Sequence, residues 1–149
     1  MDDNSLFAIA RSGLEVERQR MDVIAQNLAN AGTTRTADGE PYHPLRLVSG
    51  PRLGTSFEHH LQAGGAAAPL ELTGVQSYGV ERLDTPPRLV HDPAHPHADA
   101  NGMVAYPGID HAGEMTLMVQ TLRSYEADTV MFNAARSMYM RALELGAHS

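Results

Sequence analysis

The sequence predicts a mainly α-helical α+β fold, in which long N- and C-terminal helices pair as an antiparallel coiled coil and a loop-rich middle carries short strands. Each end of the 149-residue chain has a heptad stripe of apolar residues, whereas most of the prolines lie between the ends. Residues spaced alternately by three and four fall on one side of a helix, so each end offers an apolar seam to another helix. We expect an N-terminal assembly helix over 1–32, a loop-rich β segment over 33–110 and a C-terminal assembly helix over 111–149.

The N-terminal stripe has a single polar member, Glu17. The helix is expected to start at Asn4 or Ser5, because either side chain can cap the free N–H groups of a first turn. It is expected to end directly before Gly32, which would act as a left-handed stop. The members of the stripe are Phe7, Ala10, Leu14, Glu17, Met21, Ile24, Leu28 and Ala31.

The C-terminal stripe has the same spacing but slips once, after Phe132. Its helix is expected to follow Asp110, whose carboxylate suits a helix N-terminus, and to run to Leu145 with Gly146 as the stop. We expect simple two-helix packing to fail at the slip and at Glu17. The members of the stripe are Met115, Met118, Leu122, Tyr125, Thr129, Phe132, Ala135, Met138, Ala142 and Leu145.

The middle segment has the composition of loops and short strands. Apolar and β-branched residues predict strands over 45–48, 70–72 and 75–83, with glycines marking turns or bulges. Residues 63–69 read as a flexible loop because they consist of alanine, glycine and proline. We therefore expect a small β insert between the two helices.

Composition excludes several classes of function. The net charge is −7 and all 11 basic residues are arginines without a basic run, which argues against nucleic-acid binding. No apolar run approaches the roughly 20 residues that span a bilayer, and no cleaved signal peptide is expected. The absence of cysteine excludes thiol chemistry. Because no nucleotide, metalloprotease or serine-hydrolase motif is found, we expect no catalysis, no cofactor and no small-molecule substrate.

One cluster in the middle segment contains possible metal ligands. His91, His95 and His97 lie near Asp92 and Asp99, and these residue types can bind zinc or nickel. Prolines interrupt the cluster, so the ligands are not aligned on a helix or a regular strand. The simpler interpretation is a polar connector stiffened by proline. We predict no metal site, with a metal-binding protein using His91, His95 and His97 as an alternative function.

The segment after the N-terminal stripe carries a series of uncommon motifs. Residues 27–30 read Asn-Leu-Ala-Asn, residues 33–36 read Thr-Thr-Arg-Thr, and residues 39–42 read Gly-Glu-Pro-Tyr. In this order they resemble the bacterial flagellar axial proteins, and among these the proximal rod proteins of the flagellar basal body. The motif residues are Asn27, Asn30, Thr33, Thr34, Arg35, Thr36, Pro41 and Tyr42.

Later segments agree with this resemblance. Residues 86–99 resemble the family's Asp-Pro-x-His-Pro-x-Ala-Asp segment, and residues 123–127 and 133–138 resemble its C-terminal helix. The resemblance thins over residues 53–74. The chain also departs from the family at 107–109, where Pro-Gly-Ile stands in place of Pro-Asn-Val.

The resemblance implies a structural subunit of the bacterial flagellar rod, the drive shaft that crosses the periplasm and transmits torque. The implied partners are other rod proteins, the flagellar export apparatus and further copies of the chain. Export from the cytoplasm would use the flagellar type III apparatus without a cleaved signal peptide. A type III-secreted helical effector is an alternative. The residues expected at the assembly interface are Leu14, Met21, Ile24, Leu28, Leu122, Tyr125, Phe132 and Met138.

Overall fold

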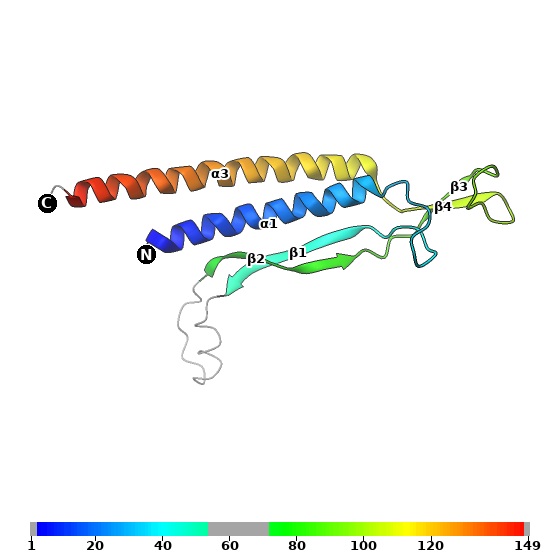
Figure 1. Cartoon of the computed structure of the whole chain (residues 1–149), viewed down its shortest axis with the longest axis horizontal. Helices are drawn as coiled ribbons and strands as arrows, with labels where there is room; N and C mark the ends of the chain where they lie inside the picture. The colour runs from blue at the N-terminus through cyan, green and yellow to red at the C-terminus, as the bar shows by residue number, and fades with distance from the viewer. Residues whose placement is uncertain (1–2, 54–71, 148–149) are drawn as a thin grey trace, which may run out of the picture. The chain divides into compact units, whose positions relative to one another are not determined.

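The computed structural model describes residues 3–53 and 72–147. Its elements follow one another in the order α1, β1, β2, β3, β4 and α3 (Figure 1). Two long helices and two small two-stranded sheets confirm the predicted, mainly helical α+β class. The chain divides into two compact units: unit 1 combines residues 1–18, 49–78 and 122–149, and unit 2 combines residues 19–48 and 79–121.

Helix α1 spans Asp3–Ala29 and confirms the predicted N-terminal helix. Its end differs from the prediction, because Gly32 does not adopt a positive φ. The side chain of Asn30 closes the helix instead: its Nδ2 donates to the carbonyl of Gln26 at 2.9 Å. The carbonyl of Asn30 in turn accepts the N–H of Thr33 at 3.0 Å. These bonds satisfy groups that a helix end leaves open, so a left-handed glycine is not needed.

Helix α3 spans His111–Ala147 and has 37 residues, which corresponds to about 55 Å. The backbone N–H of Glu114 donates to the carbonyl of Asp110 at 2.9 Å. A side-chain oxygen of Asp110 lies 2.6 Å from the position that a Cβ on Gly113 would take, so the carboxylate covers the first turn as a cap should. The helix continues through Gly146, which therefore does not act as its stop.

Strands β1 (Leu45–Leu53) and β2 (Leu72–Arg82) form the first sheet, and their arrows run in opposite directions (Figure 1). β1 begins at the predicted residue and extends beyond 48. β2 contains residues 75–82 of the strand predicted over 75–83 and residue 72 of the strand predicted over 70–72. Residues 70–71 and the predicted flexible loop over 63–69 lie outside the described residues. Gly74 and Gly79 adopt φ values of 117° and 131°, which only glycine tolerates easily.

Strands β3 (Arg88–His91) and β4 (Met103–Tyr106) form the second sheet and were not predicted. They pair antiparallel, with Arg88 opposite Tyr106 and His91 opposite Met103. Each strand has only four residues. That is too short for an alternating pattern to stand out from the prolines and histidines around it.

Polar residues take part in the buried side of α1. Ser12 and Asn27 are 6% and 1% exposed, whereas Leu14, Met21 and Leu28 of the predicted stripe are only half-buried. Within the described part of unit 1 the buried residues are Ser12, Val16 and Ala135. In unit 2 they include Val23, Ile24, Asn27, Leu47, Val104 and Thr121.

The least exposed side of α3 is also partly polar. Met118, Tyr125 and Phe132 of the predicted stripe lie on it, whereas Leu122 and Met138 are 45% and 57% exposed. This side repeats in steps of four and three without a slip, so the predicted slip after Phe132 is absent from the burial pattern. Its members are Glu114, Met118, Thr121, Tyr125, Asp128, Phe132 and Ala135.

Candidate assembly surfaces

Asn27 is the centre of a hydrogen-bonded network in unit 2. Its Nδ2 donates to the carbonyl of Leu45 at 2.9 Å and to Oε2 of Glu114 at 3.2 Å. Its Oδ1 accepts the N–H of Leu45 at 2.8 Å and the hydroxyl of Tyr42 at 3.1 Å. A side-chain amide has two donor hydrogens and two acceptor lone pairs, so every hydrogen-bonding position of this buried group is used. Asn27 thereby joins α1 to the start of β1 and the start of α3.

The same network changes the acidity of a neighbouring phenol. Burial raises the pKa of Tyr42 above its ordinary value of 10.0, and the carboxylate of Glu114 raises it further. Both causes disfavour the phenolate, so Tyr42 is held in the form that donates to Asn27.

The other motif residues shape the turn that leaves α1. Thr33 Oγ1 donates to Oδ1 of Asn30 at 3.2 Å, and the N–H of Tyr42 donates to the carbonyl of Thr33 at 3.1 Å. Thr36 uses both its N–H and its hydroxyl to bind the carbonyl of Glu40, at 2.7 and 3.0 Å. Each bond closes a turn over residues 30–42. The motif therefore specifies a backbone path, while Arg35 is exposed and Pro41 is half-buried within it.

The histidine segment adopts turns rather than the arrangement of a metal site. No group of three potential ligands that could hold a metal ion occurs within residues 3–53 and 72–147. His95 Nδ1 instead accepts the N–H of His97 at 3.1 Å, and a hydrogen bond of 2.8 Å joins His97 Nδ1 to Thr34 Oγ1. Asp99 Oδ1 accepts the N–H groups of Asn101 and Met103, both at 2.8 Å. The metal-binding alternative is therefore not supported.

Aromatic rings connect α1 and α3 within unit 1. The ring of Phe7 lies 5.6 Å from that of Phe132 and 5.8 Å from that of Tyr139, both edge to face. Further along, a Cβ added to Gly13 would lie 2.9 Å from Oδ2 of Asp128. Gly13 thus allows α3 to approach α1 closely. From Phe7 to Gly13 the residue number rises along α1, whereas from Phe132 to Asp128 it falls along α3, so the two helices run in opposite directions in unit 1.

Ser12 attaches strand β2 to α1, also in unit 1. Its hydroxyl donates to the carbonyl of Ile9 at 2.7 Å and accepts the N–H of Val75 at 3.0 Å. A Cβ on Gly74 would collide with Ser12 Oγ, and the Cα of Ile9 would be 3.3 Å away. The strand can take this position because residue 74 has no side chain.

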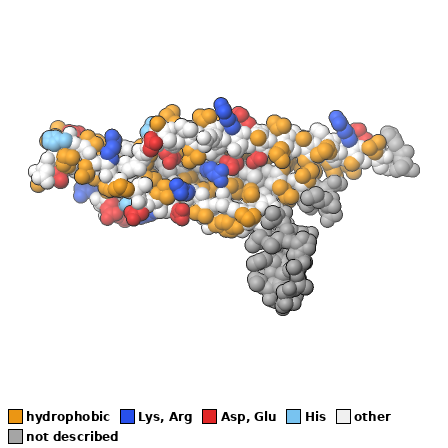
Figure 2. Space-filling model, turned by 180° about the vertical axis from the view of Figure 1, so that it is seen from behind, with side chains coloured by type: hydrophobic (Ala, Val, Ile, Leu, Met, Phe, Trp, Pro, Cys, Tyr) orange, Lys and Arg blue, Asp and Glu red, His pale blue; other side chains and the backbone are white. Residues whose placement is uncertain are grey.

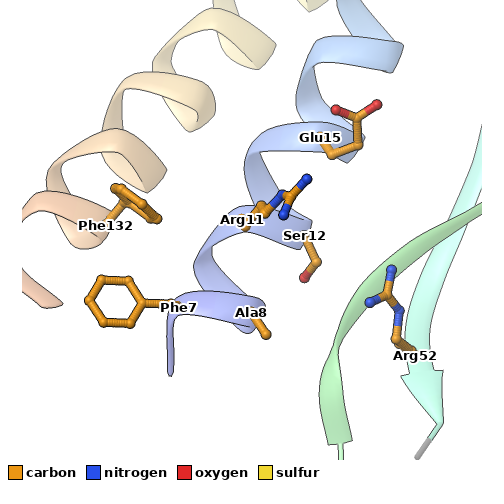
Figure 3. Close-up of a pocket in the computed structure, with 7 residues that line it drawn as sticks. All are labelled: Phe7, Ala8, Arg11, Ser12, Glu15, Arg52 and Phe132. Atoms are coloured by element: carbon orange, nitrogen blue, oxygen red, sulfur yellow. The ribbon is translucent and has the colours of Figure 1, made fainter. Parts of the chain in front are cut away.

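A groove of 630 Å³ opens in unit 1 beside these contacts. Arg11 and Glu15 border it from α1, Arg52 borders it from β1, and Phe132 borders it from α3 (Figure 3). Glu15 binds Arg18, with 2.8 Å between the carboxylate and the guanidinium. The guanidinium groups of Arg11 and Arg52 have no hydrogen bond or ion pair with any described residue. The described residues that line it are Phe7, Ala8, Arg11, Ser12, Glu15, Arg52 and Phe132.

Helix α3 exposes many large apolar side chains. Figure 2 shows orange hydrophobic side chains at the surface along the upper edge, where α3 runs. Five of the exposed residues repeat with helical spacing and define the outer stripe of α3: Ala127, Met131, Ala134, Met138 and Leu145. Met131, Met138 and Leu145 are 62%, 57% and 76% exposed. Large apolar side chains exposed in a row of this kind are typical of protein interaction sites.

The residues predicted for the assembly interface fall into three groups by exposure. Ile24 is buried in unit 2, and Leu122 and Met138 are exposed. The remaining five are half-buried: Leu14, Met21, Leu28, Tyr125 and Phe132. Sequence reasoning did not find Ser12 or Arg52, because a lone polar residue in a helix or strand carries no signal of its own. Among the described residues, no helix is long and apolar enough to cross a membrane.

Comparisons with known proteins agree with the motifs. The family model described as flagella basal body rod protein matches residues 7–35, and the model described as flagellar basal body rod FlgEFG protein C-terminal matches residues 100–145. These ranges contain most of α1 and α3. They also include Asn27 and the outer stripe.

Relatives named flagellar basal-body rod protein FlgC are similar over nearly the whole chain. The protein of Bacillus subtilis is 38% identical, over 93% of this chain and 94% of the relative. That of Escherichia coli O6:H1 is 35% identical, over 95% and 96%. That of Borreliella burgdorferi is 34% identical, over 95% of each. The chain therefore belongs to the FlgC family of flagellar basal-body rod proteins.

Proposed function

We propose that this chain is a structural subunit of the flagellar basal-body rod, which polymerises through its terminal helices into the shaft that transmits torque across the periplasm. The observation that carries the proposal is the outer stripe of α3, in which exposed Met131, Met138 and Leu145 share one side of the helix with two small alanines. A stripe with helical spacing is suited to a helix of a neighbouring subunit, because large residues fit into spaces beside small ones. The function consists of assembly and involves no chemical step.

We propose that α1 and α3 pair as an antiparallel coiled coil inside each subunit. Three contacts support this: Phe7 with Phe132 and Gly13 with Asp128 in unit 1, and Asn27 with Glu114 in unit 2. The buried polar residues make this pairing weaker than an apolar seam would be. Ordering of the helices would then be completed when neighbouring subunits cover the outer stripe.

The stripe can be tested by placing charge on it. Met131→Glu with Met138→Glu keeps good helix formers on α3 but puts two carboxylates where a neighbour would pack. In a strain that lacks its own copy of the gene, the double variant should be absent from purified hook–basal bodies and swimming should be lost. Mass spectrometry of the basal bodies and motility in soft agar measure the two effects.

The matched control adds the same charge to another side of the helix. Asn133 and Ser137 are exposed and lie four residues apart on α3. Asn133→Glu with Ser137→Glu should leave incorporation and swimming close to wild type. Normal motility of the stripe variant would contradict the proposal. A chain found in the culture medium but never in basal bodies would support a secreted effector instead.

The proposal includes export by the flagellar type III apparatus, which the resemblance to rod proteins implies. In cells without that apparatus, the chain should remain in the cytoplasmic fraction. Cell fractionation followed by immunoblotting measures its distribution. An unchanged amount outside the cytoplasm would point to another route.

A further inference from the structure

We infer that the groove lined by Arg11 and Arg52 binds the acidic turn, residues 36–40, of a second copy of this chain. The inference rests on the proposed rod function and specifies one contact between subunits. Its starting point is that two exposed guanidinium groups border the same groove (Figure 3) and find no partner among the described residues. Two like charges at one site disfavour each other unless a negative group joins them.

The groove has properties that suit a carboxylate carried by a protein. Among the described residues that line it, Glu15 is the acidic one, and it is already bound to Arg18 at 2.8 Å. Arginine binds carboxylates through two parallel hydrogen bonds, which gives direction as well as attraction. Phe7 and Phe132 add an apolar wall to the groove. The volume of 630 Å³ lies in the range of roughly 300–1,000 Å³ that is usual for binding pockets.

The acidic turn presents the complementary charge in an ordered loop. Asp38 and Glu40 are exposed on either side of Gly39, which has a φ of 86°. The N–H of Thr36 donates to the carbonyl of Glu40 at 2.7 Å, and the N–H of Gly39 donates to the carbonyl of Thr36 at 3.0 Å. A turn that is already closed loses little conformational freedom on binding. Within the described residues, the only polar contact recorded for these carboxylates is a 3.4 Å approach of Glu40 to His43.

The two surfaces share no residue, and this determines the type of assembly. A groove on one copy that binds a turn on the next makes a heterologous contact. Such a contact leaves a free groove at one end and a free turn at the other, so it can be repeated by further subunits. This is the contact geometry that a helical tube requires.

Cysteine trapping can test the contact directly, because the chain has no cysteine of its own. Ala8 lines the groove and Ala37 belongs to the acidic turn, and both are exposed. Chains carrying Ala8→Cys and chains carrying Ala37→Cys are produced together with different tags in a strain without its own copy. Hook–basal bodies are isolated and oxidised. The expected product is a disulfide-linked dimer that carries both tags. The matched control replaces Ala37→Cys by Ala94→Cys, an exposed alanine in the loop between β3 and β4.

Charge reversal supplies the second arm. Arg11→Glu with Arg52→Glu in the Ala8→Cys chain should lower the yield of the dimer by about tenfold. Asp38→Arg with Glu40→Arg in the Ala37→Cys chain should do the same, and the two reversed chains together should restore the yield. Circular dichroism of each purified variant checks that the fold is kept. If both tagged chains are present in basal bodies but the dimer is no more abundant than in the Ala94→Cys control, the inference is overturned while the rod function stands. If neither chain is present in basal bodies, the rod function itself fails.

Discussion

Asn27 and Leu45 are joined by two hydrogen bonds, from Nδ2 to the carbonyl at 2.9 Å and from the N–H to Oδ1 at 2.8 Å. The amide side chain thus pairs with the backbone of Leu45 as a neighbouring strand would. Because β1 begins at Leu45, this pair connects the end of α1 to the first residue of the sheet.

Removal of the Asn27 amide should destabilise the protein strongly. Asn27→Ala leaves the backbone groups of Leu45 without these partners in a partly buried place, which should lower the free energy of unfolding by about 2–3 kcal/mol. Urea unfolding followed by circular dichroism gives the change. Gln26→Ala, at the exposed neighbouring position, should change stability by no more than about 0.5 kcal/mol. Equal stability of the two variants would show that the network contributes nothing.

Tyr42 should make stability depend on pH in the alkaline range. Its pKa is raised in the folded protein, chiefly by burial and then by Glu114, so the folded state holds the proton more tightly than the unfolded chain. Its contribution is therefore fully present below the unfolded value of about 10 and is lost as the pH rises through the folded-state pKa. Urea unfolding between pH 8 and 11 should show this loss in the wild type, and Tyr42→Phe should reduce it.

Absorbance offers a second measurement of the same group. The chain has five tyrosines and no tryptophan, so phenolate absorbance is not obscured. The difference between the titration curves of the wild type and Tyr42→Phe should give a midpoint above 10. A midpoint at or below the ordinary value would contradict the burial of this phenol.

Alanine substitutions at two glycines of β2 should distinguish the cost of backbone strain from the cost of a steric clash. Gly74 and Gly79 both have positive φ, but a Cβ would collide with Ser12 Oγ at Gly74 and meet nothing within 4 Å at Gly79. Gly79→Ala should cost about 1–3 kcal/mol from strain alone. Gly74→Ala should cost clearly more, because it also displaces the strand from α1. Thermal unfolding ranks the two variants, and the opposite order would rule out the close approach to Ser12.

Gly32 should behave differently from these two glycines. It has no positive φ, and a Cβ there would have nothing within 4 Å. Gly32→Ala should therefore leave stability unchanged or raise it by up to about 1 kcal/mol, since alanine restricts the unfolded chain. A marked loss of stability on thermal unfolding would instead support the prediction that Gly32 ends the helix in a left-handed conformation.

Much of the architecture could be predicted because it follows from strong local signals. The long apolar repeats located α1 and α3, and strand-forming residues between glycines located most of β2. Apolar periodicity could not identify the sides that are buried, because Ser12, Thr121 and Asp128 occupy positions that a hydrophobic pattern excludes. The predicted stripe used Leu122 and Thr129 instead of Thr121 and Asp128. This choice introduced a slip that the buried side of α3 does not have.

The polar contacts of the candidate surfaces lay beyond sequence reasoning for a different reason. Glu114 is 87 positions from Asn27, and Val75 is 63 positions from Ser12. Such pairs depend on the tertiary fold and leave no periodic trace. The family motif indicated Asn27 and Tyr42 as important residues, and the structure supplies the bonds that they make.

The exposed methionines of α3 also make the free subunit sensitive to oxidants. Met115, Met131, Met138 and Met140 are all more than half exposed, at 55%, 62%, 57% and 52%. Peroxide converts an accessible thioether into a polar sulfoxide, which no longer packs well against an apolar neighbour. A subunit damaged before assembly would carry sulfoxides on the outer stripe, where they act much like the carboxylates of the glutamate variants. If neighbouring subunits cover the outer stripe as we propose, methionine sulfoxide reductases can repair such a subunit only before it assembles.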